Sequence, residues 1–394
     1  MFDTLTPPEL DKILRLMALY AADPRPGKID LGVGVYRTPT GKTPVMAVVK
    51  AAEKRIWDTQ DTKGYVGLTG DPAFLDAMRA LVLGDVVAQT RVALCATPGG
   101  TGAVRQTLEM VRRLSPMARV WLPAPTWPNH TAIADHLGFA HLTYRYYDPA
   151  TGGIDRAGMQ TDLAQAQRGD VVVLHACCHN PTGADLTPDD WAAITDILMD
   201  TGGIPFVDMA YLGFGTGLER DAAGTRHIAA RLPEALIAVS CSKNFGLYRE
   251  RVGMILAIAA DGVARDAAQG MLAHLNRQNY AFPPDHGARI VQTILNDPEL
   301  YAQWQAELTT MRDGIVANRA ALAQALQNET QSDRFDFLVN HQGMFSLIGA
   351  DPDQVRHLRE NHGIYMVADG RMNMAGLTPD RIPDIAKILA RVLM

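Results

Sequence analysis

The residues of this 394-residue chain that are best suited to covalent chemistry follow an apolar segment at 235–239. The segment contains only Ala, Leu, Ile and Val, which predicts a buried strand. Ser240, Ser242 and Lys243 come at its carboxyl end. Ligands bind at this end of the strands in open α/β sheets, and partial burial lowers the pKa of an amine toward that of a nucleophile. A lysine in this position is nevertheless more often a solvated charge.

Donors for a phosphate lie close to this amine in the sequence. The hydroxyls of Ser240 and Ser242 precede Lys243, and the guanidinium of Arg251 follows it. Hydroxyl and guanidinium groups donate hydrogen bonds to phosphate oxygens, while a nucleophilic lysine forms Schiff bases with carbonyl compounds. Pyridoxal phosphate (PLP) carries an aldehyde and a phosphate, so this combination suits PLP.

A glycine-rich turn at 97–102 is a second candidate phosphate site. It follows a strand predicted at 92–96 and precedes an amphipathic helix predicted at 103–114. The N-terminus of such a helix presents free backbone N–H groups and the positive end of its dipole to an anion, and the dipole contributes about 0.3–1 kcal/mol. The Gly-Lys-Ser/Thr ending of a nucleoside-triphosphate P-loop is absent from this turn.

Two further predicted strands carry side chains that suit a planar, protonated ring. Trp127 follows the strand at 120–124, and it could either pack in the core or lie flat on such a ring. Asp208 lies within the apolar strand at 204–210, where its charge requires a partner. A protonated pyridine nitrogen would be such a partner.

Segment 175–179 contains two histidines and two cysteines, but we predict no metal site there. Adjacent residues of the strand predicted at 171–178 point to opposite faces, and the C-x₂-C spacing is absent. Four cysteines in a chain of this length do not indicate a disulfide framework. Buried, reduced thiols are therefore expected at Cys95, Cys177, Cys178 and Cys241.

The remaining pattern predicts an α/β chain in which strands and helices alternate. Residues 1–12 are expected to be extended because Pro7 and Pro8 oppose a helix, and 29–36 to form a glycine-containing strand or turn. Further strands are predicted at 252–260, 335–348 and 363–367. Helices are predicted at 11–20, 45–58, 187–200, 262–277, 286–326 with a break near 297, 352–361 and 381–393.

Composition argues against several classes of protein. Hydrophobic residues make up 47% and charged residues 20% of the chain, as in ordinary soluble globular proteins. The formal net charge of -6 gives no basic face, so nucleic acid is not expected to be a partner. The sequence shows neither a signal peptide nor an apolar stretch long enough to cross a membrane, so we expect a cytoplasmic protein with no membrane contact.

The order of these features along the chain carries a family resemblance. The motifs extend over essentially the whole chain and lie at 32–36, 177–183, 242–246 and 370–373. In this order they closely resemble the class I aminotransferases of the aspartate/aromatic subgroup. Within that subgroup, segments 275–284 and 363–367 are most similar to bacterial aromatic amino acid aminotransferases.

The resemblance implies the α/β fold of PLP-dependent transferases of fold type I. Such a fold has a large domain with a mixed, mostly parallel seven-stranded sheet flanked by helices, and a smaller α/β domain formed from both chain ends. We place the large PLP-binding domain at 46–309, and the small domain with an N-terminal arm at 1–45 and 310–394.

The resemblance also implies a role for each residue at the cofactor. Lys243 would hold PLP covalently and move a proton, while Asp208 would keep the pyridine nitrogen protonated with support from His130. The ring would be contacted by Trp127, which stacks on it, and by Tyr211 and Asn180, which hydrogen-bond its oxygen O3′. The phosphate would be bound by Ser240, Ser242, Arg251, the N–H groups around Gly99, Gly100 and Thr101, and Tyr65 of the neighbouring subunit.

Two arginines would bind the substrate in an enzyme of this kind. Arg371 would hold the α-carboxylate in a bidentate fork, at an end of the pocket that Gly34 lines. Trp127 and Asn180 would also face the substrate. Arg277, contributed by the other subunit, would bind a side-chain carboxylate, and charged hydrogen bonds of this type are worth about 1.5–3 kcal/mol each. Sites that are completed by the other subunit imply a homodimer.

The expected activity is transfer of the amino group of phenylalanine, tyrosine and tryptophan, and of aspartate, to 2-oxoglutarate by a ping-pong mechanism between PLP and pyridoxamine phosphate. Ala281 and Asp369 replace serines that are common in the subgroup, which argues against strict aspartate specificity. The alternatives are a dedicated aspartate aminotransferase, another PLP reaction such as β-elimination or decarboxylation, and a transcription regulator with an aminotransferase-like domain. The regulator would require a DNA-binding module, and no basic helix-turn-helix segment precedes the pattern.

Overall fold

The computed structural model describes residues 2–6, 11–38 and 40–394, and the chain forms two compact units. The first comprises Met1–Thr43, Ile315–Asn340 and Met344–Met394, and the second comprises Pro44–Gly314 and His341–Gly343. Helix α11 (Pro298–Thr330) contributes residues to both units. The assignment of 46–309 to a PLP-binding domain, and of both chain ends to a small domain, stays a prediction.

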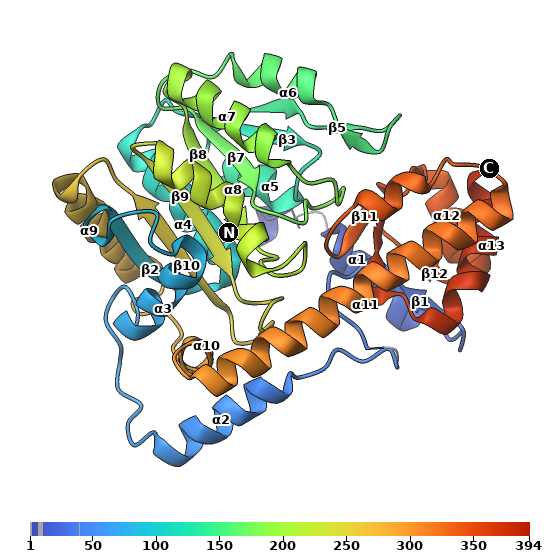
Figure 1. Cartoon of the computed structure of the whole chain (residues 1–394), viewed down its shortest axis with the longest axis horizontal. Helices are drawn as coiled ribbons and strands as arrows, with labels where there is room; N and C mark the ends of the chain where they lie inside the picture. Colours follow the sequence, from blue (N-terminus) through green and yellow to red (C-terminus); the bar gives the residue numbers. More distant parts are fainter. Residues whose placement is uncertain (1, 7–10, 39) are drawn as a thin grey trace. The chain divides into compact units, whose positions relative to one another are not determined.

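A seven-stranded sheet forms the centre of the second unit (Figure 1). Its strand order is β2-β10-β9-β8-β7-β3-β4. β10 is antiparallel to both of its neighbours, and the other strands run in one direction. The predicted mixed, mostly parallel sheet is therefore confirmed. Its strands are β2 (Val92–Pro98), β3 (Arg119–Ala124), β4 (Ala140–Arg145), β7 (Val171–His175), β8 (Ile204–Met209), β9 (Ala235–Ser240) and β10 (Val252–Ile258).

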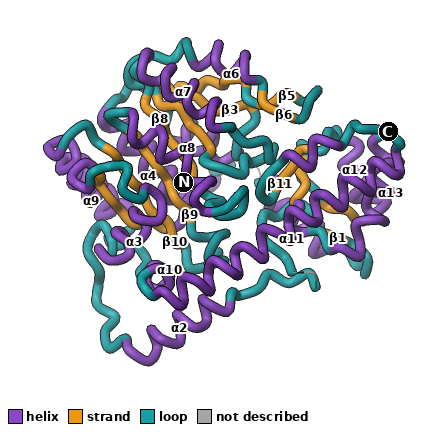
Figure 2. Tube along the Cα trace, viewed as in Figure 1, coloured by secondary structure: helices purple, strands orange, loops and turns teal. Residues whose placement is uncertain are grey.

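Helices flank this sheet, as Figure 2 shows in purple around the orange strands. α4 (Gly99–Leu114) and α9 (Gly262–Asn279) share one hydrophobic core with the strands. A further group of helices is formed by α8 (Leu218–Arg231) with α3 (Pro72–Leu83) and α7 (Pro188–Thr201), both of which contact α8. Strands that are covered on both faces are apolar throughout. The continuous apolar runs in the sequence therefore predicted the central strands.

Smaller elements complete the second unit. The hairpin strands β5 (Tyr147–Asp148) and β6 (Gly153–Ile154) pair antiparallel. The remaining helices are α2 (Ala47–Thr59), α5 (Pro128–His136), α6 (Arg156–Leu163) and α10 (His286–Leu295).

The first unit contains two small sheets. β1 (Ile29–Asp30) pairs parallel with β12 (Ile364–Tyr365), and β11 (Phe345–Leu347) pairs antiparallel with β13 (Arg371–Asn373). Segments from near both chain ends therefore share a sheet. The α-helices described in this unit are α1 (Lys12–Ala22), α12 (Pro352–His362) and α13 (Ile382–Leu393), together with the end of α11.

The structure corrects two boundaries that matter for the site. The helix predicted to begin at 103 begins at Gly99, so 99–102 form its first turn instead of a glycine turn. Glycine is favoured at position 99 because the φ of 73° there lies in the left-handed region. The strand predicted at 171–178 ends at His175, because the backbone bends after it and Cys178 adopts a left-handed φ of 54°.

Other corrections concern the ends of the chain. Much of the strand predicted at 335–348 is a 3₁₀-helix at Asp336–Asn340, and only β11 is extended. Phe2–Thr4 form a 3₁₀-helix where extended chain was predicted, because the prolines expected to oppose a helix come after this turn. Pro7 and Pro8 lie outside the described residues.

Two predictions from composition can be compared with the structure. Each of the four cysteines is buried and outside any disulfide bond, as expected. Among the helices described, none combines the length and the apolar character that a membrane span requires. The cytoplasmic location stays a prediction.

Candidate active site

The predicted cofactor residues lie at one edge of the seven-stranded sheet. β2, β3, β7, β8 and β9 end at this edge, and the antiparallel β10 begins there. The carboxyl edge of such a sheet gathers side chains that are far apart in the sequence. The residues at or just beyond these strand ends are Gly99, Gly100, Thr101, Trp127, His130, Asn180, Asp208, Tyr211, Ser240, Ser242, Lys243 and Arg251.

Glycines allow the N-terminus of α4 to approach β9 and β10 closely. A Cβ on Gly100 would lie 2.7 Å from the Cβ of Ser240. A Cβ on Gly253, which pairs with Ser240 in the sheet, would lie 2.4 Å from the carbonyl carbon of Gly99. Any larger residue would force these backbones apart, because protein interiors leave no such space.

The groups around this helix N-terminus form a donor set for a phosphate. Ser240 and Ser242 are buried, and the N–H of Ser242 donates to Ser240 Oγ at 3.2 Å. Arg251 precedes β10, and one of its guanidinium nitrogens donates to the Tyr248 carbonyl at 3.1 Å. A helix N-terminus, two hydroxyls and a guanidinium together match the charge and the acceptors of a dianion.

A chain of hydrogen bonds leads from the Asn180 backbone to the carboxylate of Asp208. His130 Nε2 lies 3.0 Å from Asp208 Oδ2, and His130 Nδ1 lies 2.8 Å from Thr126 Oγ1. Thr126 Oγ1 lies 3.1 Å from His175 Nε2, and the N–H of Asn180 donates to His175 Nδ1 at 3.4 Å. Every donor finds an acceptor when each histidine carries one proton on Nε2.

Electrostatics favour an ionised Asp208 beside a neutral His175. Burial alone would raise the pKa of Asp208, but the hydrogen bond from His130 and the nearby charge of Lys243 hold that pKa below its usual value. Burial lowers the pKa of His175 to about 3, so this imidazole is neutral near neutral pH. A buried anion at the sheet edge is ready to hold a proton on a bound ring nitrogen.

Lys243 follows β9 and is half-buried. Its Nζ lies 5.1 Å from the centroid of the Tyr211 ring, so the structure brings these two predicted residues together. The loop that carries Lys243 is held by α11, because Trp304 Nε1 of that helix donates to the Asn244 carbonyl at 2.8 Å. The Phe245 ring also stacks on Trp304, with centroids 4.5 Å apart.

The structure brings Tyr65 and Arg277 to the same aromatic side chain, Phe282. Tyr65 is 87% exposed, and its ring stacks on that of Phe282 with centroids 4.7 Å apart. The guanidinium carbon of Arg277 lies 5.8 Å from the Phe282 centroid. The two residues that were predicted to act in a neighbouring subunit therefore share one surface of the second unit.

Arg371 and Gly34 belong to the first unit. Arg371 is 6% exposed and lies on β13, where its Nη2 donates to the Gly32 carbonyl at 2.9 Å. Its guanidinium carbon lies 4.2 Å from the centroid of the Phe345 ring. A Cβ on Gly34 would lie 2.7 Å from the same ring, so both residues are packed around Phe345. Asp369 accepts a hydrogen bond from the backbone N–H of Arg371 at 3.0 Å.

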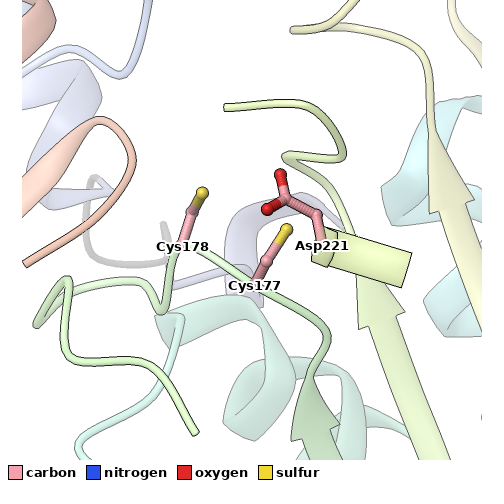
Figure 3. Close-up of side chains that lie close together, drawn as sticks. All are labelled: Cys177, Cys178 and Asp221. Carbon is pink, nitrogen blue, oxygen red and sulfur yellow. The ribbon is translucent and has the colours of Figure 1, made fainter. Parts of the chain in front are cut away.

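Cys177, Cys178 and Asp221 lie together, with ligand atoms within 4.8 Å of one another (Figure 3). The argument that the two thiols point to opposite faces was wrong, because both residues lie beyond the end of β7. The Asp221 carboxylate accepts the backbone N–H groups of Gly213, Gly215 and Thr216 at 2.7–2.9 Å.

This group is poorly suited to a metal ion. A hydrogen bond with Cys178 and burial raise the pKa of the Cys177 thiol well above its usual value, whereas metal ligation requires a thiolate. The carboxylate of Asp221 is already engaged by the 213–216 loop. That the chain needs no metal stays a prediction.

Several residues that support the site were not predicted from the sequence. Thr126 and His175 link Asn180 to His130, and Trp304 fixes the Lys243 loop. Asp185 accepts the backbone N–H groups of Cys178 and His179 at 2.6 and 2.8 Å, which orders the turn that carries Asn180. Among these residues, only His175 was noticeable in the sequence, as a histidine within a predicted apolar strand.

Comparison with known proteins gives consistent matches. Residues 26–389 match the family model of class I and II aminotransferases. The chain is 55% identical to an aromatic-amino-acid aminotransferase of Paracoccus denitrificans over 100% of both chains. It is 43% identical to an aspartate aminotransferase of Salmonella typhi, also over 100% of both. The solved structure of an aromatic-amino-acid aminotransferase from Burkholderia pseudomallei, covalently bound to pyridoxal phosphate, has a TM-score of 0.97 and 39% identity over 100% of both chains.

Proposed function

Because the chain belongs to the family of class I and II aminotransferases, we propose that it transfers the amino group of aromatic amino acids, and of aspartate, to 2-oxoglutarate with PLP as its cofactor. The observation that carries this proposal is the placement of Lys243, Asp208 and the donors around α4 at one sheet edge. The names of the aromatic-amino-acid relatives support the aromatic part. The aspartate relatives support the dicarboxylate part.

The chemistry of the donor set fits PLP. The N-terminus of α4 with Ser240, Ser242 and Arg251 would bind the phosphate, and Trp127 would stack on the ring. When bound, PLP supplies an electron sink for the charge that develops at the substrate Cα. The close approach of Gly100 to Ser240 supports a phosphate bound jointly by the N–H groups of α4 and the Ser240 hydroxyl.

Two residues of the site would handle protons. Lys243 would hold the cofactor covalently between turnovers, and its Nζ would take the proton from the substrate Cα and return it to the C4′ position. Asp208 would hold a proton on the pyridine nitrogen. The carboxylate is fixed for this task, because His130 binds Oδ2 and is itself held by Thr126. Tyr211 and Asn180 would hydrogen-bond the ring oxygen.

Substrate binding would divide between the two arginines. Arg371 would bind the α-carboxylate in a fork that lysine cannot reproduce. Arg277 would bind the side-chain carboxylate of aspartate or 2-oxoglutarate, and Tyr65 would reach the phosphate, both from the neighbouring subunit of a homodimer. The exposure of Tyr65 supports this assignment, since a side chain that reaches another subunit must leave its own surface.

An aromatic side chain offers Arg277 no carboxylate in the same pocket. Burying an unpaired guanidinium is costly, so Arg277 must stay in water or against an aromatic face when a neutral ring binds. Phe282 offers such a face at 5.8 Å. Ala281 also lacks the hydroxyl of the serine that is common at this position in the subgroup.

The test is a comparison of kcat/KM for phenylalanine and aspartate, with 2-oxoglutarate as acceptor and PLP present. Values within about tenfold of each other would match one pocket that accepts both side chains. Turnover of aspartate without measurable turnover of phenylalanine would identify a dedicated aspartate aminotransferase. Formation of ammonia or carbon dioxide instead of the 2-oxo acid would identify another PLP reaction.

A further inference from the structure

Three polar side chains form a cluster at the last turn of α9, two of them buried and the third, Tyr280, half-buried. Gln106 of α4 is 1% exposed and Asn276 of α9 is 0% exposed. Gln106 Nε2 donates to Asn276 Oδ1, and the Tyr280 hydroxyl lies within hydrogen-bond distance of that oxygen and 3.1 Å from Gln106 Oε1. Burial raises the pKa of Tyr280, so its hydroxyl is a neutral donor, and its single hydrogen serves one of these oxygens at a time.

Asn276 ties this cluster to the neighbouring segments. Its Nδ2 donates to the Leu68 carbonyl at 2.7 Å and to the Ala96 carbonyl at 3.2 Å. Leu68 lies in the segment that carries Tyr65, and Ala96 lies on β2, which leads directly into α4. A fully hydrogen-bonded buried amide of this kind fixes the geometry of the elements that it joins.

Arg277 is adjacent to Asn276 in the last turn of α9, and the chain after it is strained. The N–H of Phe282 donates to the Tyr280 carbonyl at 2.8 Å, which makes Ala281 the central residue of a γ-turn. The φ of Ala281 is 64°, a left-handed value that is unfavourable for a residue with a Cβ. Such a turn persists only where its surroundings hold it.

Contacts on both sides hold this turn. On the inner side, the Tyr280 hydroxyl is anchored to Gln106 and Asn276. On the outer side, the Phe282 ring stacks on Tyr65. Arg277 lies over the Phe282 ring, so the position of its guanidinium depends on both contacts.

We propose that Gln106, Asn276 and Tyr280 are positioning residues that hold Arg277 for the side-chain carboxylate of the substrate, and that they thereby set the preference for dicarboxylate over aromatic substrates. This inference rests on the role proposed above for Arg277. A carboxylate fork requires the guanidinium in one place, because its two parallel hydrogen bonds are directional and weaken when the groups are misaligned. A neutral ring makes no such fork, so its binding does not require the anchor.

The test is Tyr280→Phe in the holoenzyme, which removes the hydroxyl and keeps the ring. We expect the KM for aspartate and the inhibition constant of maleate, a dicarboxylate, to rise about tenfold or more. The KM for phenylalanine, the inhibition constant of hydrocinnamate and both kcat values are expected to stay within about twofold, since the groups at the reacting atoms are untouched.

Gln106→Met removes the amide that bonds to Tyr280 and Asn276. It is likewise expected to weaken the binding of aspartate relative to that of phenylalanine. Tyr144→Phe is the matched control, because it removes another buried tyrosine hydroxyl, which donates to the Val173 carbonyl at 2.8 Å. The control is expected to leave the ratio of aspartate to phenylalanine kcat/KM unchanged. Melting temperatures of all variants separate selectivity from stability.

The outcomes distinguish the two proposals. If the unaltered enzyme uses both substrates but Tyr280→Phe and Gln106→Met leave the ratio unchanged or lower both activities equally, the positioning proposal is overturned and the proposed function stands. If the unaltered enzyme uses neither substrate, the proposed function fails and the positioning proposal fails with it.

Discussion

At the scale of single residues, the acid–base character of the site is set by burial and by one hydrogen-bond chain. Asp208 could be identified from the sequence because a charge within an apolar strand requires a partner. Thr126 and His175 could not, because their roles depend on distances between strand ends that only the folded sheet creates. Because the pKa of His175 is lowered to about 3, the free energy of unfolding depends on pH through this residue.

We predict that acid destabilises the protein partly through His175. The folded-state pKa of about 3 lies below the ordinary value of 6.5, so the unfolded chain binds more protons between these pH values. The free energy of unfolding should therefore fall as the pH falls from 6.5 toward 3, by up to about 1.4 kcal/mol per pH unit from this group. Urea unfolding midpoints measured between pH 7 and pH 4 would show this slope.

His175→Gln can still donate to Thr126 but does not titrate, so its stability should depend less steeply on pH. His136→Gln alters an exposed histidine of α5 and is the matched control. Equal slopes for His175→Gln and the unaltered protein would show that His175 does not contribute to the acid dependence.

At the scale of elements, the central strands were predictable and several helices were not. β7, β8, β9 and β10 are apolar runs because both faces are covered, and all four were predicted, although β7 ends three residues earlier than expected. Helices α3, α5, α6 and α8 were missed, although α3 and α5 begin with a proline in the first turn. The start of α4 was missed because glycines usually indicate a turn, whereas here they allow a close approach to β9 and β10.

This close approach leads to a prediction for Gly100→Ala. The added Cβ would meet the Cβ of Ser240 at 2.7 Å and push the N-terminus of α4 away from β9. We expect the dissociation constant for PLP, measured by fluorescence titration of the apoenzyme, to rise about tenfold or more, because several phosphate hydrogen bonds would lengthen together.

Gly270→Ala is the control for that experiment. Gly270 lies in α9, and nothing lies within 4 Å of a Cβ added there. This variant should bind PLP normally and gain up to about 1 kcal/mol of stability from helix propensity. Normal PLP binding by Gly100→Ala would contradict the role assigned to the N-terminus of α4.

At the scale of the whole molecule, the proposed homodimer places two essential groups of one site on different chains. The sequence could suggest this division only through family resemblance, since neither composition nor periodicity indicates which residues cross an interface. Tyr65 and Arg277 share the aromatic contact with Phe282 on one surface of the second unit. Lys243 lies at the sheet edge of the same unit.

Mixed dimers test this division. Lys243→Ala and Arg277→Ala chains, each nearly inactive toward aspartate alone, should regain activity when they are unfolded together and refolded. A mixed dimer then contains one site with both groups intact, so random pairing should restore about a quarter of the normal activity. If activity stays at the sum of the two parent variants, Arg277 acts within its own chain.

The most direct test of the proposed function is the absorption spectrum of the purified enzyme, because the proposed reaction depends on PLP bound to Lys243. We predict a visible absorption band that Lys243→Ala lacks, and conversion of that band to the pyridoxamine form by phenylalanine and by aspartate. Protein reconstituted with PLP that shows no visible band, or a band that Lys243→Ala retains unchanged, would contradict the central claim.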